Sequence, residues 1–376
     1  SSFSKILDDF KDKGNWNYIF YDKKLRPIRN IQKNYLGGFT QIDTKLDNFR
    51  GRTEYILTTH SRATQNSELA IKEAFAYDWQ ERLLTHTHQV NEGTEEYLTQ
   101  NQYDELGQLK NKRVGGQIRN SGLQQVDYKY NIRGWLTDIN DVNNLSPSGQ
   151  PKDLFSFKIN YDQLFDNIYN QIYPQYNGNI SETYWRTSSD QILREYSYVY
   201  DPMNRLTDAF YNKPESPDPF QGRYNERFIT YDKNGNIQKM KRYGISDLNL
   251  TLMDMIYFIY KPNSNQLVSV EDISNEPAGF NDGNTIGDDY AYDTNGNMIQ
   301  DLNKGITSIS YNYLNLPVKI TSSKGTIEYL YDAGGIKLQK QVKKGVQTNI
   351  THYLGGFQYQ ENVLQFFPHG EGYYDN

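Results

Sequence analysis

The sequence contains no cysteine among its 376 residues. This absence excludes disulfide bonds and metal sites built from thiolates. Apolar side chains are also scarce, since only 36% of residues are hydrophobic and the mean hydropathy is −0.85. The chain therefore offers no run of about 20 mainly apolar residues, which a bilayer-spanning helix would need.

Charge of one sign is not in large excess either. The 40 Lys and Arg residues face 46 Asp and Glu residues, which leaves a formal net charge of −6. Nucleic-acid binders usually carry a clear basic excess, so nucleic acid is not an expected partner. Few apolar residues alone would favour disorder, but 33 Tyr and 17 Phe residues argue against it. A polar chain rich in tyrosine suits thin antiparallel β-sheet.

A Tyr-Asp pair recurs along the chain. It stands at Tyr21-Asp22, Tyr77-Asp78, Tyr103-Asp104, Tyr161-Asp162, Tyr200-Asp201, Tyr231-Asp232, Tyr292-Asp293 and Tyr331-Asp332. Variants of the pair stand at Tyr130-Asn131, Tyr260-Lys261 and Tyr311-Asn312. Internal repeats of this kind predict a repetitive fold.

Each repeat predicts a strand, a tight turn and a second strand. Residues 196–200 and 227–231 alternate with period two before the tyrosine, which is typical of a strand. The Asp or Asn can start a turn, and Asn234-Gly235 favours a primed hairpin turn with positive φ at both positions. Successive hairpins would form one long antiparallel sheet, in which we expect the repeat tyrosines to stack as cross-strand neighbours.

Other segments interrupt the Tyr-Asp repeats: a duplicated Gly-Gly segment, two expected helical turns and three expected loops. Residues 34–39 (Asn-Tyr-Leu-Gly-Gly-Phe) resemble residues 352–357 (His-Tyr-Leu-Gly-Gly-Phe), and Gly-Gly again predicts a hairpin turn. Short helical turns are expected at residues 4–10 and 162–173. The Pro-, Gly- and acid-rich stretches predict loops at residues 143–152, 212–222 and 275–289.

The Tyr-Asp repeats resemble those of the RHS/YD-repeat family, which includes bacterial RHS proteins and the animal teneurins. The family pattern, Tyr-Asp followed by three variable residues and Gly/Asn-Arg-Leu, is matched well at residues 103–109 and 200–206 and more loosely at 77–83 and 331–337. The resemblance covers residues from about Tyr18 to Tyr359. Three further stretches resemble a bacterial subgroup whose members are surface or secreted proteins, many exported by the type 9 pathway. They are residues 131–140, 177–185 and 353–372.

The resemblance implies an all-β fold, a repetitive antiparallel β-hairpin strip that spirals into a hollow shell, with a partial shell in this segment. We expect a single repeat segment over residues 1–376, with N-terminal strands at 1–76, the main repeats at 77–345 and strands at 346–376 that lead to a C-terminal core. In the family's toxin members an aspartyl autoprotease core releases the cargo. Neither that core nor a toxin follows here, so the chain is expected to be a segment of a longer protein.

Candidate sites for chemistry are few. His86 and His88 share one strand face but have no third ligand at a suitable spacing, so a polar strand face is the favoured interpretation. The Asp-rich turns lack the Gly and Glu of an EF-hand. The acidic loop at residues 281–289 could hold a cation, although a solvated loop is favoured. We therefore predict no metal, no cofactor and no catalytic residue, and the Tyr and Asp residues of the repeats are expected to be structural.

The expected function is a non-catalytic wall of a large exported bacterial RHS-repeat protein, which encloses or displays a C-terminal polypeptide. Its expected partner is that cargo or core domain, and the expected location is the cell surface or the medium. The alternative is a surface adhesin or gliding-type protein that binds glycans or other cells. In either case an outer-membrane translocon of the type 9 system could be a partner during export.

Overall fold

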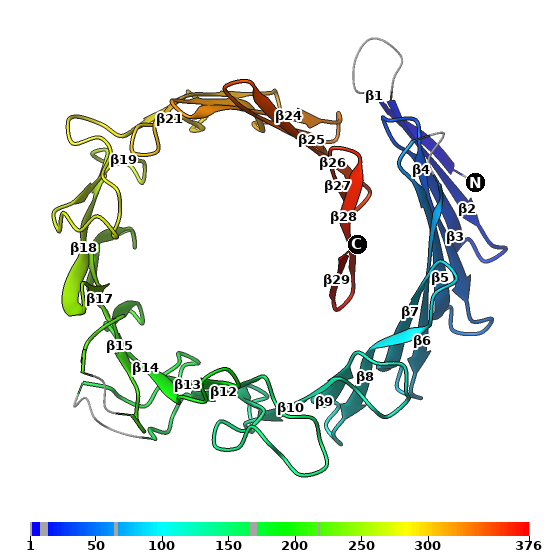
Figure 1. Ribbon diagram of the computed structural model, residues 1–376, viewed down its shortest axis with the longest axis horizontal. Coiled ribbons are helices and arrows are strands. Elements are labelled where there is room, and N and C mark those ends of the chain that lie inside the picture. Colours follow the sequence, from blue (N-terminus) through cyan, green and yellow to red (C-terminus); the bar gives the residue numbers. More distant parts are fainter. Residues whose placement is uncertain (1, 8–13, 64–66, 166–170, 217–218, 376) are drawn as a thin grey trace. The chain divides into compact units, whose positions relative to one another are not determined.

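The computed structural model describes residues 2–7, 14–63, 67–165, 171–216 and 219–375, and these residues form strands and turns without a helix (Figure 1). It follows that no helix in this part of the chain could span a membrane.

The strands come in two sets. The first set is β1 Ser2–Leu7, β2 Gly14–Tyr21, β3 Pro27–Lys33, β4 Phe39–Leu46, β5 Thr53–Ser61, β6 Leu69–Tyr77, β7 Leu83–Val90, β8 Glu96–Tyr103, β9 Leu109–Val114, β10 Gln124–Tyr130, β11 Leu136–Ile139, β12 Phe155–Asn160, β13 Glu182–Thr187, β14 Arg194–Tyr200, β15 Leu206–Asn212, β16 Glu226–Tyr231, β17 Ile237–Ser246, β18 Asn249–Tyr260 and β19 Leu267–Asp272. The second set is β20 Tyr290–Tyr292, β21 Met298–Asp301, β22 Ile306–Tyr311, β23 Pro317–Ser322, β24 Gly325–Tyr331, β25 Lys337–Lys344, β26 Gln347–Leu354, β27 Phe357–Gln360, β28 Val363–His369 and β29 Gly372–Asp375.

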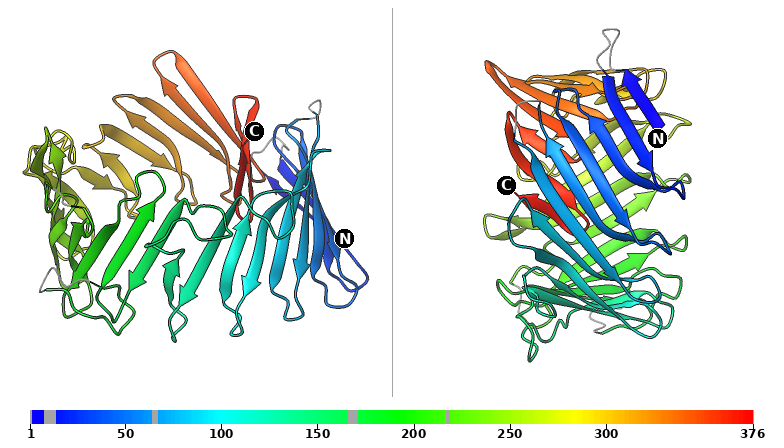
Figure 2. Two further views of the ribbon diagram at one scale, coloured as in Figure 1. Left: turned by 60° about the horizontal axis from the view of Figure 1, so that its bottom comes forward. Right: turned by 90° about the vertical axis from the view of Figure 1, so that its right-hand side faces the viewer.

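Each set forms one antiparallel sheet, and each strand pairs with its neighbour in sequence. Figure 2 shows successive strands lying side by side as a strip, as in β2 to β8. The predicted all-β, repetitive antiparallel strip is therefore confirmed. Short-range pairing of this kind needs no crossover connection, because a tight turn can join antiparallel strands.

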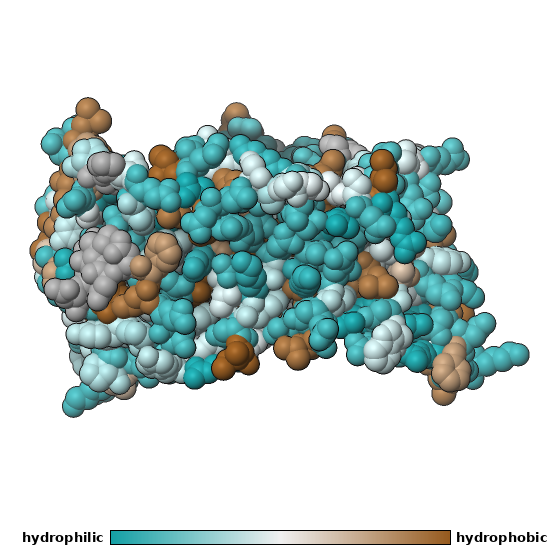
Figure 3. Space-filling view, turned by 90° about the horizontal axis from the view of Figure 1, so that it is seen from below, coloured by the Kyte–Doolittle hydropathy of each residue, from teal (hydrophilic) through white to brown (hydrophobic). Residues whose placement is uncertain are grey.

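Two compact units share the chain. The first unit contains residues 1–102, 112–123 and 308–376, and the second contains residues 103–111 and 124–307. Among the described residues, each unit has a small buried apolar cluster: Ile71, Leu354, Phe357, Tyr359 and Phe367 in the first, and Val142, Tyr184 and Leu193 in the second. On the face drawn in Figure 3, hydrophilic residues predominate and hydrophobic residues are scattered in small groups.

The expected helical turns are wrong where the structure describes them. Residues 4–7 belong to β1, which pairs with β2 over its whole length, so backbone pairing overrides the local pattern. Residues 8–10 lie outside the described residues. Residues 162–165 and 171–173 form bends and turns, and residues 166–170 also lie outside the described part. The loops predicted at 143–152 and 275–289 are present.

The repeat tyrosines end their strands. They are the last residues of β2, β6, β8, β10, β14, β16, β18, β20, β22 and β24, and Tyr161 follows the last residue of β12. The pairing register shifts at this point, for example between Val199 and Tyr200 and between Ala76 and Tyr77. The shift is a β-bulge, which bends the strand and increases its twist locally. The tyrosine thus stands where each strand gives way to its turn.

Candidate functional site: repeat turns and a histidine-lined contact

Asp201 shows how the aspartate of a repeat holds its turn. Its Oδ1 accepts hydrogen bonds from the backbone N–H groups of Met203 and Arg205, both at 2.9 Å. Its Oδ2 accepts a further bond from Nε of Arg205 at 2.8 Å. The Arg205 backbone bond holds the pKa of Asp201 below its usual range, because it favours the charged carboxylate.

The same two bonds from backbone N–H groups two and four residues on recur along the chain. The acceptors are Asn34, Asp22, Asp78, Asp104, Asn131, Asp232, Asp293, Asn312 and Asp332. The side-chain oxygen thus accepts hydrogen bonds from backbone N–H groups in the turn, which have no strand partner there. This is the behaviour of an Asx-turn. A carboxylate is not required, since asparagine makes the same bonds.

The turn type differs from the predicted one. In the Asp232 turn, positive φ occurs at Gly235 (88°) and not at Asn234, so the turn is not a primed one. The residue three positions after the Asp or Asn has positive φ in many turns, including Gly107, Gly296 and Asn204. The side-chain bonds of the Asp favour this wider loop, in which only the last position needs a left-handed backbone.

The repeat tyrosine ties each unit to the one before it. The hydroxyl of Tyr231 donates a 2.6 Å hydrogen bond to the carbonyl of Leu206, the residue that restarts the preceding strand. The guanidinium of Arg205, from the preceding turn, lies 4.5 Å from the centre of the Tyr231 ring. Burial raises the pKa of Tyr231, so its hydroxyl keeps its proton at neutral pH.

This bond also recurs along the described part of the chain. The hydroxyl-to-carbonyl pairs are Tyr130 to Leu109, Tyr161 to Leu136, Tyr200 to Ile180, Tyr260 to Ile237 and Tyr292 to Leu267, at 2.7–3.1 Å. Because each carbonyl belongs to the neighbouring unit, the tyrosine fixes the spacing of hairpins while the aspartate fixes the turn.

Replacing Asp201 by alanine is expected to lower the thermal midpoint of unfolding by about 2–4 °C. The backbone donors of Met203 and Arg205 would lose their acceptor. Asp201→Asn should cost less, because Asn131 makes the same pair of bonds naturally. Thermal unfolding of both variants checks this, and equal losses would contradict the proposed role of Oδ1.

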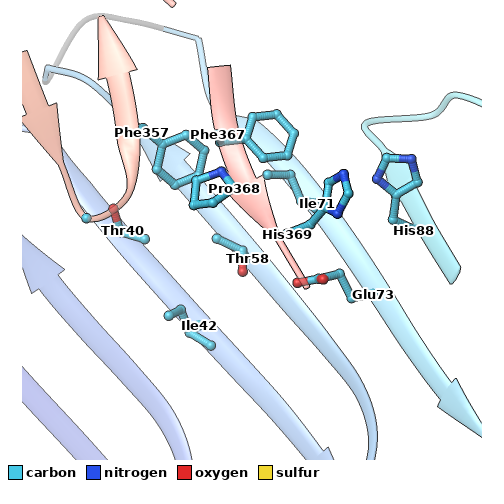
Figure 4. A pocket seen from close by; sticks show the side chains of 11 residues that line it. Thr40, Ile42, Thr58, Ile71, Glu73, His88, Phe357, Phe367, Pro368 and His369 are labelled. Atoms are coloured by element: carbon cyan, nitrogen blue, oxygen red, sulfur yellow. The ribbon is translucent and has the colours of Figure 1, made fainter. Parts of the chain in front are cut away.

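A second arrangement, which we call the terminal contact, joins the ends of the first unit. The strands β26 to β29 pack on one face of β4 to β7 (Figures 1 and 4). A cavity of about 110 Å³ lies between them, and its lining includes Thr40, Glu73, His88, Phe367 and His369. The sequence separation across this contact is about 300 residues, as in the bond from Tyr359 to His60.

All five histidines of the chain take part in the terminal contact or border it. His60 stacks on Phe357 with ring centres 3.7 Å apart and planes at 4°, and its Nε2 lies 3.0 Å from the Tyr359 hydroxyl. Nδ1 of His352 lies 2.5 Å from the Tyr35 hydroxyl. The three other histidines are His86, His88 and His369.

His86 and His88 do not form the metal site that their spacing could allow. Nε2 of His86 lies 2.8 Å from Oε1 of Glu73, and the ring of His88 faces that of His369 at 5.7 Å. Within the described part of the chain, no three His, Cys, Asp or Glu residues are placed to hold a metal ion.

The duplicated Gly-Gly segments meet at this contact. Gly355 and Gly356 form the turn between β26 and β27, and the position of a Cβ on Gly355 would be 3.3 Å from Oγ1 of Thr40. Tyr35 and Leu36, from the first copy, pack on the cluster that contains Leu354. The internal similarity of residues 34–39 and 352–357 was therefore a signal for the contact, although it predicted only the turns.

A pair of buried carboxylates lies in the second unit. Glu182 and Glu195 are 0% and 1% exposed. They lie on one face of β13 and β14, where Glu182 is opposite Ser197 and Glu195 is opposite Tyr184. Burial raises the pKa of Glu195, and the charge of Glu182 raises it further. Neither side chain reaches solvent, so both carboxylates depend on partners within the protein.

Most oxygens of these two carboxylates accept hydrogen bonds. Oε2 of Glu182 accepts bonds from Nδ2 of Asn160 and from the backbone N–H of Phe165, at 2.9 and 2.8 Å. Oε1 of Glu195 accepts bonds from the hydroxyls of Ser197 and Tyr184, at 2.6 and 3.2 Å. Oε1 of Glu182 has no hydrogen-bond partner among the described residues.

In the acidic loop, Asp289 is buried and bonded within the fold, whereas Oδ1 of Asp282 is buried without a hydrogen-bond partner among the described residues. Asp289 accepts bonds from the backbone N–H of Val270 and from the amides of Asn284 and Asn303, at 2.7–3.0 Å. Asp282 accepts a long bond of 3.4 Å from the backbone N–H of Asp272. These side chains accept hydrogen bonds from backbone N–H groups where the pairing between strands stops, as Asn140 and Asn225 do elsewhere. Sequence reasoning missed this role, because isolated polar residues at strand ends carry no periodic signal.

Comparisons with known proteins add a likeness in fold. No family model matches the chain, and no curated protein matches it. Three solved structures are similar: TcdB2-TccC3-Cdc42 (TM-score 0.55, 14% identity, 93% of this chain), TcdB2-TccC3 (0.54, 12%, 94%) and TcdB2-TccC3 without its hypervariable C-terminal region (0.51, 14%, 96%). The chain spans about a fifth of the length of those chains. At these identities the likeness shows the fold alone.

Proposed function

We propose that this chain is a length of wall in an RHS/YD-repeat shell, and that the shell belongs to a larger exported bacterial protein. Its role is non-catalytic containment or display of a C-terminal polypeptide. The observation that carries the proposal is the bond from six of the repeat tyrosines to the preceding unit, as from Tyr231 to Leu206, because it ties successive hairpins together. The likeness in fold to TcdB2-TccC3 supports it.

The chemistry of the strip suits containment. Its buried residues include many polar side chains, and its apolar clusters are small. A polar wall offers an enclosed polypeptide little apolar surface to bind, so the polypeptide would be held by enclosure and could be released. One of the similar solved proteins has a C-terminal region described as hypervariable, which is the place where a cargo would differ among proteins.

The test is the mass of the full-length protein, purified from its natural source, under native and then denaturing conditions. Containment of a cleaved cargo predicts one native particle that separates into a large and a small polypeptide. A single uncleaved chain under both conditions would overturn containment of a cleaved cargo and leave display or adhesion.

Adhesion is the second candidate, and exposed apolar side chains at the turns favour it. Three apolar side chains at turns are largely exposed: Leu25 (82%), Trp79 (78%) and Ile132 (104%). Each lies within three residues of a turn-forming Asp or Asn. Isolated exposed apolar residues are common, but a series of them at turn tips could contact a glycan or another cell. An uncleaved chain that binds cells, with binding lost in Trp79→Ala, would support adhesion. Passage through a type 9 translocon belongs to both candidates.

A further inference from the structure

We propose that the terminal contact is a pH-sensitive clasp, which holds while its histidines are neutral and opens when they are protonated. The geometry carries the proposal, because four of the chain's five histidines contact one another or other residues where β26 to β29 meet β4 to β7, and the fifth, His86, borders this contact. The clasp lies within the first unit, so it does not depend on what the chain encloses.

His60 is the most enclosed member, with 1% of its surface exposed. The groups on its ring are neutral: the hydroxyl of Thr40 at 2.8 Å from Nδ1, the hydroxyl of Tyr359 at 3.0 Å from Nε2, and the face of Phe357. A proton on this ring would bury a charge with no carboxylate in contact with it. Burial accordingly lowers the pKa of His60 to about 4.

His352 has a cation on one side and a carboxylate further off. The Tyr35 hydroxyl contacts its Nδ1. Burial lowers its pKa, the charge of Arg62 lowers it further, and Glu361 opposes them. Arg62 also reaches the C-terminal strands, since its Nη2 donates to the carbonyl of Glu361 at 3.4 Å. Protonation of His352 would therefore place a second cation beside Arg62 in the terminal contact.

His88 and His369 face each other across the contact. Burial lowers the pKa of both, and a charge on His86 lowers both further. A charge on His88 also lowers the pKa of His369. Glu73 opposes these effects at both rings, together with Glu96 at His88 and Glu371 at His369. The carboxylate of Glu371 is already paired with Nζ of Lys112 at 2.6 Å. The ring of Tyr374 packs on His88 as well.

The sign of the pH effect follows from these shifts. A histidine freed from the contact regains a pKa of about 6.5, so the open form takes up protons that the closed form refuses. The contact is therefore strongest above about pH 6.5 and weakens as the pH falls toward the lowered values. For His60 alone, a fall from pH 7.5 to 5 raises the equilibrium constant for opening about 30-fold. His88, His352 and His369 act in the same direction.

The test uses the full chain with two introduced cysteines, Trp79→Cys and Val363→Cys. These are its only thiols, and both positions are exposed, at 78% and 61%. Spin labels there report the distance between the N-terminal strands and β28 by pulsed electron resonance. We expect one narrow distance at pH 7.5 and an added long-distance population at pH 5. An unchanged distance over this range would overturn the proposal.

Histidine variants separate the clasp from general acid unfolding. In a variant with Gln at positions 60, 88, 352 and 369, the long-distance population at pH 5 should be absent. His60→Gln alone should reduce opening at pH 5 by about 30-fold, because glutamine can still bond to Thr40 and Tyr359 but cannot take up the proton. This single variant provides the test if the fourfold variant does not close at pH 7.5.

His86→Gln is the matched control. Its ring nitrogen bonds to Glu73 on the adjacent strand of the same sheet and its ring stacks on Phe75, so its main contacts do not cross the clasp. A charge on His86 lowers the pKa of His88 and His369. We therefore expect this variant to open at a pH only slightly below that of the parent, a much smaller change than in His60→Gln. If His60→Gln opens at the parent's pH, the histidines do not drive opening and the proposal is wrong.

Discussion

Replacing Phe357 by alanine is expected to destabilise the first unit by about 3–5 kcal/mol, the usual cost of removing a buried aromatic side chain. Phe357 is 5% exposed, its ring stacks on His60, and it contacts the ring of Phe367 with centres 5.4 Å apart. Its loss would leave a cavity in the small cluster that joins the ends of the unit. The free energy of unfolding in urea, followed by circular dichroism at pH 7.5, measures the effect.

Phe49→Ala is the control, because Phe49 lies in the same unit but is 88% exposed. Substitution at such an exposed position usually changes stability by no more than about 0.5 kcal/mol. If both variants lost the same stability, the cluster around Phe357 would not be what holds the terminal strands in place.

Replacing Glu182 by alanine is expected to destabilise the second unit by about 2–4 kcal/mol. The amide of Asn160 and the backbone N–H of Phe165 would both lose their buried acceptor. Glu182→Gln should instead be neutral or stabilising at pH 7, because it keeps an acceptor and removes one of two neighbouring buried charges. Pulsed hydrogen exchange of peptides that cover β12 to β15 measures both effects.

The same pair gives a pH dependence opposite to that of the clasp. The pKa of Glu195 is raised in the folded chain, so the native state takes up a proton before the unfolded chain does. Stability of the second unit should therefore rise as the pH falls from 7 toward about 4.3, and the rise should be smaller in Glu182→Gln. A fall in stability of this region over that range would contradict the raised pKa.

The local parts of the fold could be predicted from the sequence. Alternation before Tyr200 and Tyr231 indicated strands, and the Asp after each tyrosine indicated a turn. These features depend on residues within about five positions of one another, which a sequence pattern can show. The turn type was wrong because two bonds from one Asp side chain, as at Asp232, outweigh the preference of Asn-Gly for a primed turn.

The contacts between distant residues could not be predicted in the same way. The tyrosine hydroxyl finds a carbonyl about 25 residues back, and any residue supplies a carbonyl, so the partner has no side-chain signature. His60 and His352 are single residues in polar strands, and only the folded chain shows that both lie in the terminal contact. Burial of Glu182 and Glu195 likewise depends on the loop that follows β12, whose course the sequence did not indicate.

The turn of a repeat is held by the Asp or Asn of that repeat, and the tyrosine hydroxyl, as in Tyr231, bonds to the repeat before it. Gain or loss of a whole repeat would thus leave every surviving bond with an equivalent partner, whereas a change of one or two residues within a repeat would break the pairing register. During evolution, duplication or deletion of single repeats can therefore change the number of strands in the sheet in discrete steps, without substitutions in the remaining repeats.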